Sequence, residues 1–189
     1  MERIDVSVLM AVYKKDNPAF LRESLESIFT QTVEAGEVVL LEDGPLTEAL
    51  YEVIKSYQSK YPALRVVAYP MNRGLGKTLN DGLQLCKYDI VARMDADDIC
   101  KSNRFETEYN WLKAHEDYDV IGSWVDEFTN DKTQVRSIRK VPEQYEDIKK
   151  YARYRCPVNH PTVMYRKAAV QAVGGYLTEY FPEDYFLWL

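Results

Sequence analysis

Two aspartates separated by one residue, Asp95 and Asp97, follow an apolar run in the segment "DIVARMDADDI". In extended backbone, residues two apart point the same way, so both carboxylates can converge on one point. Like charges repel unless a cation lies between them, and Mg²⁺ or Mn²⁺ with bound phosphate oxygens meets that need. A solvated acidic turn, or a helix N-cap formed by Asp98, is the alternative for an isolated pair. A second carboxylate at a strand end, Asp43 in "EVVLLEDG", favours the metal-site interpretation.

These carboxylates follow predicted strands in a pattern where strands and helices alternate. Continuous apolar runs rich in β-branched residues are typical of buried parallel strands. Four such runs are "DVSVLMAVY", "EVVLLEDG", "LRVVAY" and "DIVARMDADD"; helices are predicted from Pro18, over 47–60 and over 78–85. Asn17 is the predicted N-cap before Pro18. The pattern predicts a doubly wound α/β sheet, mainly parallel, that binds ligands beyond the carboxyl ends of its strands.

Beyond about residue 103 the alternation loosens. A helix is predicted over 103–115, strands in "DVIGSWVDEF" and "TQVRSIRKV", and a short helix over 142–151. Antiparallel strands in this half would make the sheet mixed. With no repeat and no linker, residues 1–189 are interpreted as a single domain. The ending "EDYFLWL" stops inside an apolar pattern, so we expect the chain to be truncated at its C-terminus.

The stretch "NRGLGKT" (residues 72–78) resembles a phosphate-binding loop at first sight. That loop needs G-x-x-x-x-G-K-[ST], and Met71 stands where the first glycine should be. Without that glycine the backbone cannot curl around phosphates in the same way. We therefore interpret the stretch as the start of a helix, and an ATP- or GTP-hydrolysing enzyme of the P-loop class is disfavoured.

Six segments together resemble the family 2 glycosyltransferases with the GT-A fold, a Rossmann-like, doubly wound, mixed but mainly parallel sheet flanked by helices. They are "VSVLMAVYKKDNPAFLRESLESIFTQT", "VVLLEDGP", "NRGLGKTLNDGL", "YDIVARMDADDI", "NHPTVMYRKAAVQAVGGY" and "EDYFLW". The segments occur in the family's order and cover nearly the whole chain. The resemblance implies an inverting enzyme that moves a sugar from a nucleotide-sugar, a UDP-sugar by preference, to an acceptor hydroxyl.

The resemblance also implies roles for residues near the donor. Ala11 and Tyr13 end the first strand, where the family's backbone lines the nucleoside pocket. Asp43 matches the aspartate that binds uracil, and Asp95 matches the first D-x-D aspartate, near the ribose or donor sugar. Asp97 matches the second, the ligand of a divalent metal (Mn²⁺ or Mg²⁺) on the diphosphate.

On the acceptor side, Asp184 in "PEDY" matches the family's catalytic base. A carboxylate base there would activate an acceptor hydroxyl, which is a poor nucleophile. Glu183 is the less favoured candidate for the same role, and a helix N-terminal acid is the alternative for Asp184. His160 lies in a segment near the acceptor in the family, and Arg73 is a candidate contact to the donor nucleotide.

Composition limits the other partners. The chain has 189 residues, 46% of them hydrophobic and 29% charged, and a net charge of -6. This composition is that of a soluble globular protein without a basic stripe, so we expect no nucleic-acid partner. Three cysteines without a C-x-x-C pair indicate reduced thiols in a cytoplasmic protein. The expected acceptor is a saccharide or a lipid-linked sugar, as in cell-surface polysaccharide biosynthesis, which allows peripheral association of the full-length protein with the inner face of the membrane.

Two other functions stay open on the sequence. A sugar-1-phosphate nucleotidyltransferase shares the fold class and the metal, but it should carry a glycine-rich basic loop after the first strand. This chain has "AVYKKDNP" there, without glycine. A non-catalytic nucleotide-sugar-binding module would keep the fold without needing Asp97 and Asp184 together.

Overall fold

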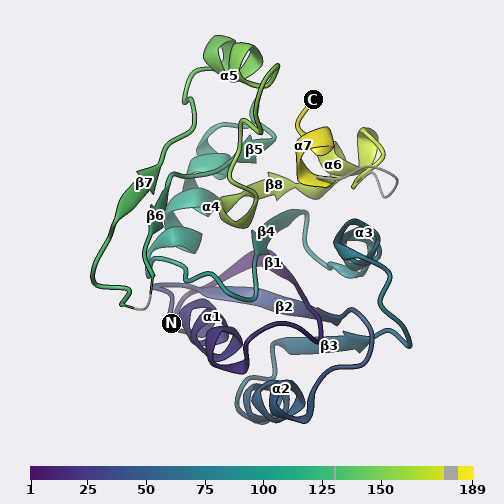
Figure 1. The fold of residues 1–189 in the computed structure, drawn as a ribbon. Helices are drawn as coiled ribbons and strands as arrows, with labels where there is room; N and C mark the ends of the chain where they lie inside the picture. Colours follow the sequence, from purple (N-terminus) through teal and green to yellow (C-terminus); the bar gives the residue numbers. More distant parts are fainter. Residues whose placement is uncertain (130, 177–182) are drawn as a thin grey trace.

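The structure is a computed structural model that describes residues 1–129, 131–176 and 183–189. Its centre is a six-stranded sheet in the order β3-β2-β1-β4-β8-β5, with helices on both faces (Figure 1). The first half of the chain alternates strands and helices as predicted: β1 (Arg3–Val12), α1 (Pro18–Phe29), β2 (Glu34–Glu42), α2 (Glu48–Lys60), β3 (Leu64–Ala68), α3 (Leu75–Leu85) and β4 (Ile90–Met94).

The four strands of this half pair in parallel, with β1 between β2 and β4 and with β3 beside β2. Their side chains alternate between two apolar layers. Val8 and Met10 pack in the layer that contains residues of α1, α2 and α4, whereas Leu9 packs in the layer that contains residues of α3 and α6. Both faces of the sheet are therefore buried, which explains why these strands are continuous apolar runs.

The predicted start of α1 is confirmed, whereas α3 begins earlier than predicted. Asn17 caps α1 through a hydrogen bond from the Ala19 backbone N–H to its side-chain oxygen (2.9 Å), and Pro18 opens the helix. α3 begins at Leu75, three residues before the predicted start at Thr78, because Gly74 already serves as the N-cap.

The second half contains α4 (Arg104–Ala114), β5 (Val120–Ile121), β6 (Val125–Glu127), β7 (Ser137–Arg139), α5 (Tyr145–Tyr151), a 3₁₀ turn (His160–Thr162), β8 (Met164–Arg166), α6 (Lys167–Ala172) and α7 (Glu183–Leu187). β8 runs antiparallel to both β4 and β5, so the sheet is mixed as expected. The segment "DVIGSWVDEF" forms two strands and not the single strand predicted. The Ser123 backbone N–H bonds the Thr162 hydroxyl (3.0 Å), which turns the chain away from the sheet between β5 and β6.

β6 and β7 then form a separate antiparallel hairpin, which lies to the left of β8 in Figure 1, with α5 above β8 and α7 to the right. The parallel pairing of β1 with β2 and β4 places the carboxyl ends of these strands at one edge of the sheet. Strand order reverses direction around β1, and ligands of open α/β sheets bind at such a point. The predicted residues Asp43 and Asp95 follow strands that end at this edge.

Candidate active site

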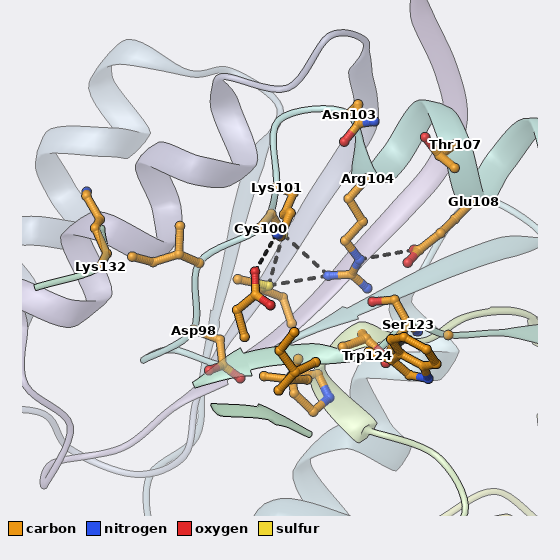
Figure 2. A pocket seen from close by; sticks show the side chains of 18 of the residues that line it. Asp98, Cys100, Lys101, Asn103, Arg104, Thr107, Glu108, Ser123, Trp124 and Lys132 are labelled. Atoms are coloured by element: carbon orange, nitrogen blue, oxygen red, sulfur yellow. Dashed lines mark hydrogen bonds and ion pairs between the residues drawn. The ribbon is translucent and has the colours of Figure 1, made fainter. Parts of the chain in front are cut away.

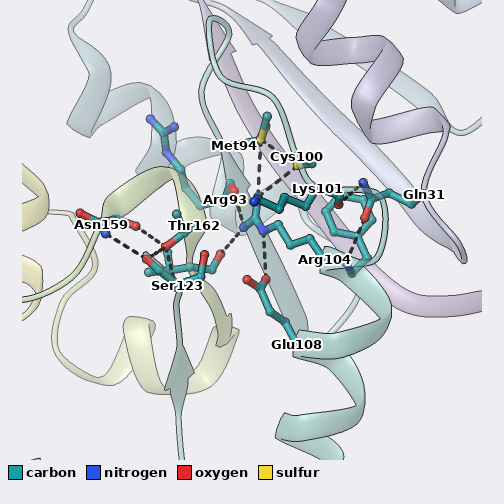
Figure 3. Close-up of polar contacts among 12 residues, drawn as sticks. Gln31, Arg93, Met94, Cys100, Lys101, Arg104, Glu108, Ser123, Asn159 and Thr162 are labelled. Atoms are coloured by element: carbon teal, nitrogen blue, oxygen red, sulfur yellow. Dashed lines mark hydrogen bonds and ion pairs between the residues drawn. The ribbon is translucent and has the colours of Figure 1, made fainter. Parts of the chain in front are cut away.

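Asp95 follows the last residue of β4 and is held by a buried cation. The Arg93 side chain is 1% exposed, and its Nη1 forms an ion pair with Asp95 Oδ1. Within the described residues, Nε of Arg93 has no hydrogen-bond partner. A buried guanidinium is costly unless it is paired, so Arg93 and Asp95 fix each other's position. Figure 3 shows Arg93 above the segment that carries Asn159 and Thr162.

The backbone turns immediately after Asp95, so the extended geometry expected for Asp95 and Asp97 is wrong. β4 ends at Met94, and residues 96–97 form a turn. Asp95 consequently lines a cleft, whereas Asp97 is exposed to solvent. Burial raises the pKa of Asp98 to about 6, and the negative charges of Asp95 and Asp97 add to that rise. The three carboxylates therefore lie close enough for their charges to influence one another.

Asp16, in the loop after β1, is a fourth carboxylate in this region that the sequence did not suggest. Its side chain accepts a hydrogen bond from the Tyr13 backbone N–H (2.9 Å). Burial raises its pKa, and the charges of Asp97 and Asp95 contribute to the rise. The adjacency of β1 and β4 in the sheet creates this proximity, which only the weak pattern of an acid shortly after a strand could have indicated.

Asp43, after β2, is buried and holds the start of α3. Its Oδ1 accepts from the Arg73 backbone N–H (2.7 Å), and its Oδ2 accepts from the Asn72 side-chain amide (2.9 Å) and the Gly74 N–H (3.1 Å). Gly44 has a φ of 86°, and a Cβ there would lie 2.5 Å from the Asn72 nitrogen. The N–H groups that a phosphate loop would present are thus bonded to Asp43, in agreement with the helix-start interpretation of this stretch.

The other donor-side candidates lie at the same sheet edge. Ala11 pairs with Leu41 near the carboxyl end of β1, and Tyr13, just beyond β1, is 40% exposed. The Arg73 guanidinium lies over the Tyr69 ring at 3.6 Å and forms a 2.7 Å ion pair with Asp81. Neither Ala11, Tyr13 nor Arg73 lines the cleft that contains Asp95.

That cleft has a volume of about 530 Å³ and brings together three of the predicted residues, Asp95, His160 and Asp184. Asp184 comes from α7 on the opposite side of the site from β7 and α5 (Figure 1). The side chain of Glu183, the alternative base, lies outside the described residues. Segments far apart in sequence therefore place two carboxylates and one imidazole around a single cavity.

His160 is buried and electrically neutral in this setting. Burial lowers its pKa well below the usual range, and the nearby charge of Arg93 lowers it further. Its Nε2 shares a 3.1 Å hydrogen bond with the Tyr176 hydroxyl. Asn80 of α3 holds the backbone of Tyr176 by two bonds, of 2.6 and 2.8 Å. His160 is thus part of a supporting network, and Asn80 is a member that the sequence did not identify.

Cys156 contacts the candidate base. Its Sγ lies 3.6 Å from Asp184 Oδ2 and 3.1 Å from the Val158 carbonyl oxygen. Burial raises the pKa of the Cys156 thiol to about 11, and the Asp184 charge contributes to that rise. The thiol therefore stays protonated near neutral pH and can donate to the Asp184 carboxylate.

A second cavity, of about 720 Å³, lies between α4 and the β6–β7 hairpin (Figure 2). Its walls include Trp124 and Phe128, and at its inner end Arg104 bonds Glu108 (3.0 Å). Of the acidic triplet after β4, Asp98 alone lines this cavity. Asp95 and Asp98 therefore line different cavities, and Pro161 lines both.

The described residues contain no cluster of three or more His, Cys, Asp or Glu side chains arranged to hold a metal ion. Asp95 and Asp97 nevertheless offer the hard oxygen donors that Mg²⁺ and Mn²⁺ prefer, and such ions are usually completed by waters and substrate phosphates. The donor set thus fits a metal that binds together with a diphosphate. Among these residues, none of the helices is long and apolar enough to span a membrane.

Comparisons with known proteins agree on one family. A family model described as Glycosyl transferase family 2 matches residues 7–174. The chain is 43% identical over 183 residues to the Escherichia coli UDP-Gal:alpha-D-GlcNAc-diphosphoundecaprenol beta-1,3-galactosyltransferase, covering 97% of this chain and 66% of that protein.

Two solved structures share the fold. TarS 1–349 of S. aureus in complex with UDP has a TM-score of 0.75 at 20% identity, covering 98% of this chain and 54% of its own. A mannosyltransferase of Pyrobaculum calidifontis in complex with GDP-Man and Mn²⁺ has a TM-score of 0.71 at 17% identity, covering 97% and 50%. The chain thus spans about two thirds of the E. coli relative and about half of these structures.

Proposed function

The chain belongs to glycosyl transferase family 2 and has the GT-A fold, and from this premise we propose that it is an inverting, metal-dependent glycosyltransferase. Its proposed donor is a UDP-sugar, because the E. coli relative is named for a UDP-Gal donor. Its proposed acceptor is a lipid-linked sugar, since the relative is named for GlcNAc-diphosphoundecaprenol. The observation that carries the proposal is the shared cleft of Asp95 and Asp184.

On the donor side, the proposal assigns the uracil to Asp43, the nucleoside to Ala11 and Tyr13, and a nucleotide contact to Arg73. A carboxylate has about four lone-pair positions. Three N–H groups already bond Asp43, so one position stays for an imide N–H of uracil. The same three bonds keep the carboxylate rigid, which reduces the entropy lost on binding.

Asp97 is the proposed metal ligand, and Asp95 is its neighbour on the side of the donor sugar. Asp97 is exposed and has no hydrogen bond or ion pair within the described part of the chain, so its oxygens are available to a cation. Asp95 is aimed into the cleft by Arg93. A divalent metal there would supply positive charge to the diphosphate that leaves with UDP.

Asp184 is the proposed general base. It takes the proton of the acceptor hydroxyl while that oxygen attacks the anomeric carbon and the bond from this carbon to the UDP oxygen breaks. Attack on the face opposite the leaving group inverts the anomeric configuration in one step. The Cys156 thiol, 3.6 Å from Asp184 Oδ2, orients the carboxylate for this transfer.

The test is turnover of a panel of UDP-sugars by the Asp184→Asn variant. The amide cannot accept the proton, so we expect kcat to fall by about 10²- to 10⁴-fold while the Kd for UDP stays unchanged. Asp117→Asn, an exposed aspartate outside the cleft, is the matched control. Full turnover by Asp184→Asn would refute the base assignment, and absence of any turnover in the parent chain would favour a binding module.

A further inference from the structure

Two cations of the Asp184 cleft have no acidic partner. Lys140, after β7, and Arg155, after α5, both line the cleft and are exposed. Lys140 lies 4.4 Å from the centre of the Trp124 ring, and the Arg155 side chain has no hydrogen bond or ion pair within the described residues. Their neighbour Arg139 differs, because it bonds Glu127 at 2.6 and 3.0 Å.

The two cations also stand apart from the acids of the same cleft. No ion pair within 4.0 Å joins Lys140 or Arg155 to Asp95 or Asp184 among the residues that the structure describes. The cleft thus has unpaired cations after β7 and α5, and on its other side Asp184 of α7 and Asp95, which is paired with Arg93. In a chain with a net charge of -6, uncompensated positive charge at this position indicates an anionic ligand.

Both the nucleotide-sugar donor and a lipid-linked acceptor can carry phosphate groups into the site. The donor diphosphate is assigned above to Asp97, which does not line this cleft. The acceptor hydroxyl must reach Asp184, which shares the cleft with Lys140 and Arg155. A cavity of about 530 Å³ lets one sugar contact the base while a group attached to it contacts the cations.

We propose that Lys140 and Arg155 bind the phosphate groups of the acceptor, and that the acceptor is therefore a sugar esterified to a phosphate or diphosphate. The inference rests on the proposed function and adds to it the residues that bind the phosphate or diphosphate group of the acceptor. Arginine and lysine bind phosphate through charge-assisted hydrogen bonds, which are stronger than neutral ones and are weakened by salt.

The experiment compares two probes with the same sugar and the same decyl chain: N-acetylglucosamine on a decyl diphosphate, and the neutral decyl glycoside that lacks the diphosphate. Their Kd values are measured with the parent chain and with Lys140→Gln/Arg155→Gln. The control is Lys149→Gln/Arg153→Gln, which removes the same charge from exposed positions of the same region outside the cleft. Lys149 also resembles Lys140 in lying near an aromatic ring, at 5.3 Å from the Tyr145 centre.

We expect the parent chain to bind the diphosphate probe more tightly than the neutral one. Lys140→Gln/Arg155→Gln should raise the Kd for the diphosphate probe about 10- to 100-fold and leave the Kd values for the neutral probe and for UDP unchanged. Equal binding of both probes by the parent chain would overturn the inference. So would an equal loss of UDP affinity, which would assign the cations to the donor, or an equal effect of the control pair.

These measurements are separable from the proposed function, because probe binding needs no turnover. Failure of the UDP-sugar panel with normal discrimination between the probes would leave the anion site intact and remove the transferase. Normal turnover of UDP-sugars with equal binding of the two probes would support the transferase and overturn the anion site.

Discussion

Arg93 and Asp95 show how one ion pair can serve both stability and function. The guanidinium is almost fully buried, whereas about a third of the Asp95 side chain is exposed, at 32%. Removal of one partner from a buried pair leaves an uncompensated charge, which costs about 3–5 kcal/mol when both partners are enclosed. Water reaches Asp95, so the cost in this protein should be smaller.

We therefore expect Asp95→Asn to lower the free energy of unfolding by about 2–3 kcal/mol. Asp97→Asn should change it by no more than about 0.5 kcal/mol, because Asp97 is exposed and unpaired among the described residues. Urea denaturation of both variants without metal or nucleotide makes the comparison. Similar stabilities of the two variants would contradict the role of Asp95 as the counter-ion of Arg93.

The sequence could identify the carboxylates at strand ends but not the partners that orient them. Asp43 and Asp95 follow apolar runs, so their place at the ligand edge of the sheet was predictable. Arg93 is a charged residue inside a run that is otherwise apolar, and such a residue can indicate a buried partner for a nearby carboxylate. Asp16 had no comparable signal, because it approaches Asp95 and Asp97 only through the pairing of β1 with β4.

α3 links the donor edge to the acceptor side through Asn80. The Gly175 backbone approaches this side chain so closely that a Cβ would lie 2.2 Å from Asn80 Oδ1, and its φ is 74°. Asn80 then accepts from the Tyr176 N–H and donates to the Tyr176 carbonyl. The glycines of "GGY" thus allow a loop to dock on α3, which places Tyr176 against His160.

Asn80→Ala should destabilise the chain by about 2–3 kcal/mol, because it leaves two buried backbone groups of Tyr176 without partners. Asn110→Ala, at an exposed position of α4, is the control and should change stability by about 0.5 kcal/mol or less. Thermal and urea unfolding of both variants measure the difference. Equal stability of Asn80→Ala and the parent chain would show that Asn80 does not hold this loop.

α4 is anchored by charges that are buried beneath the D-x-D turn. Arg104 donates to the carbonyl oxygens of Arg93 (2.9 Å) and Val163 (3.1 Å) as well as to Glu108 (Figure 3). Burial raises the pKa of Glu108 to about 7, although the Arg104 charge opposes the rise. The folded chain therefore holds a proton on Glu108 that the unfolded chain would release at lower pH.

This shift gives stability a defined dependence on pH. A carboxyl whose pKa is higher in the folded state contributes stability below its unfolded pKa, about 4.5, and loses it as pH rises through about 7. Relative to Glu108→Gln, the parent chain should thus lose up to about 3 kcal/mol of stability between pH 4.5 and pH 8. Denaturation of both proteins across this range cancels the other titrating groups. If the parent chain instead gained stability relative to Glu108→Gln as the pH rises, the Arg104 charge would dominate and lower the pKa of Glu108.

Over the whole molecule, the two halves were not equally predictable. The parallel half consists of strands buried on both faces and of capped helices, so apolar runs and N-cap residues identify them directly. The other half contains strands of only two or three residues, such as β5 and β8, which are too short for a period of two to be recognised. β8 is a strand because β4 offers it a partner, which is a tertiary cause that a local pattern does not contain.

Donor binding should stabilise the parallel half, because the proposed donor site draws its residues from the ends of β1 and β2 and from the turn after β4. A ligand that binds only the folded chain stabilises it by RT ln(1 + [L]/Kd), about 2.7 kcal/mol at 100 times Kd. For a chain of this size that corresponds to a rise in Tm of about 5–10 °C. We expect this rise with UDP and Mn²⁺ together, a much smaller one with UDP and a chelator, and none with UDP and Mn²⁺ in Asp97→Ala. Differential scanning calorimetry measures it. The same rise in Tm without metal, or in Asp97→Ala, would show that donor binding does not need the metal. The assignment of Asp43 to the uracil would then have to be tested separately, by substitution of Asp43.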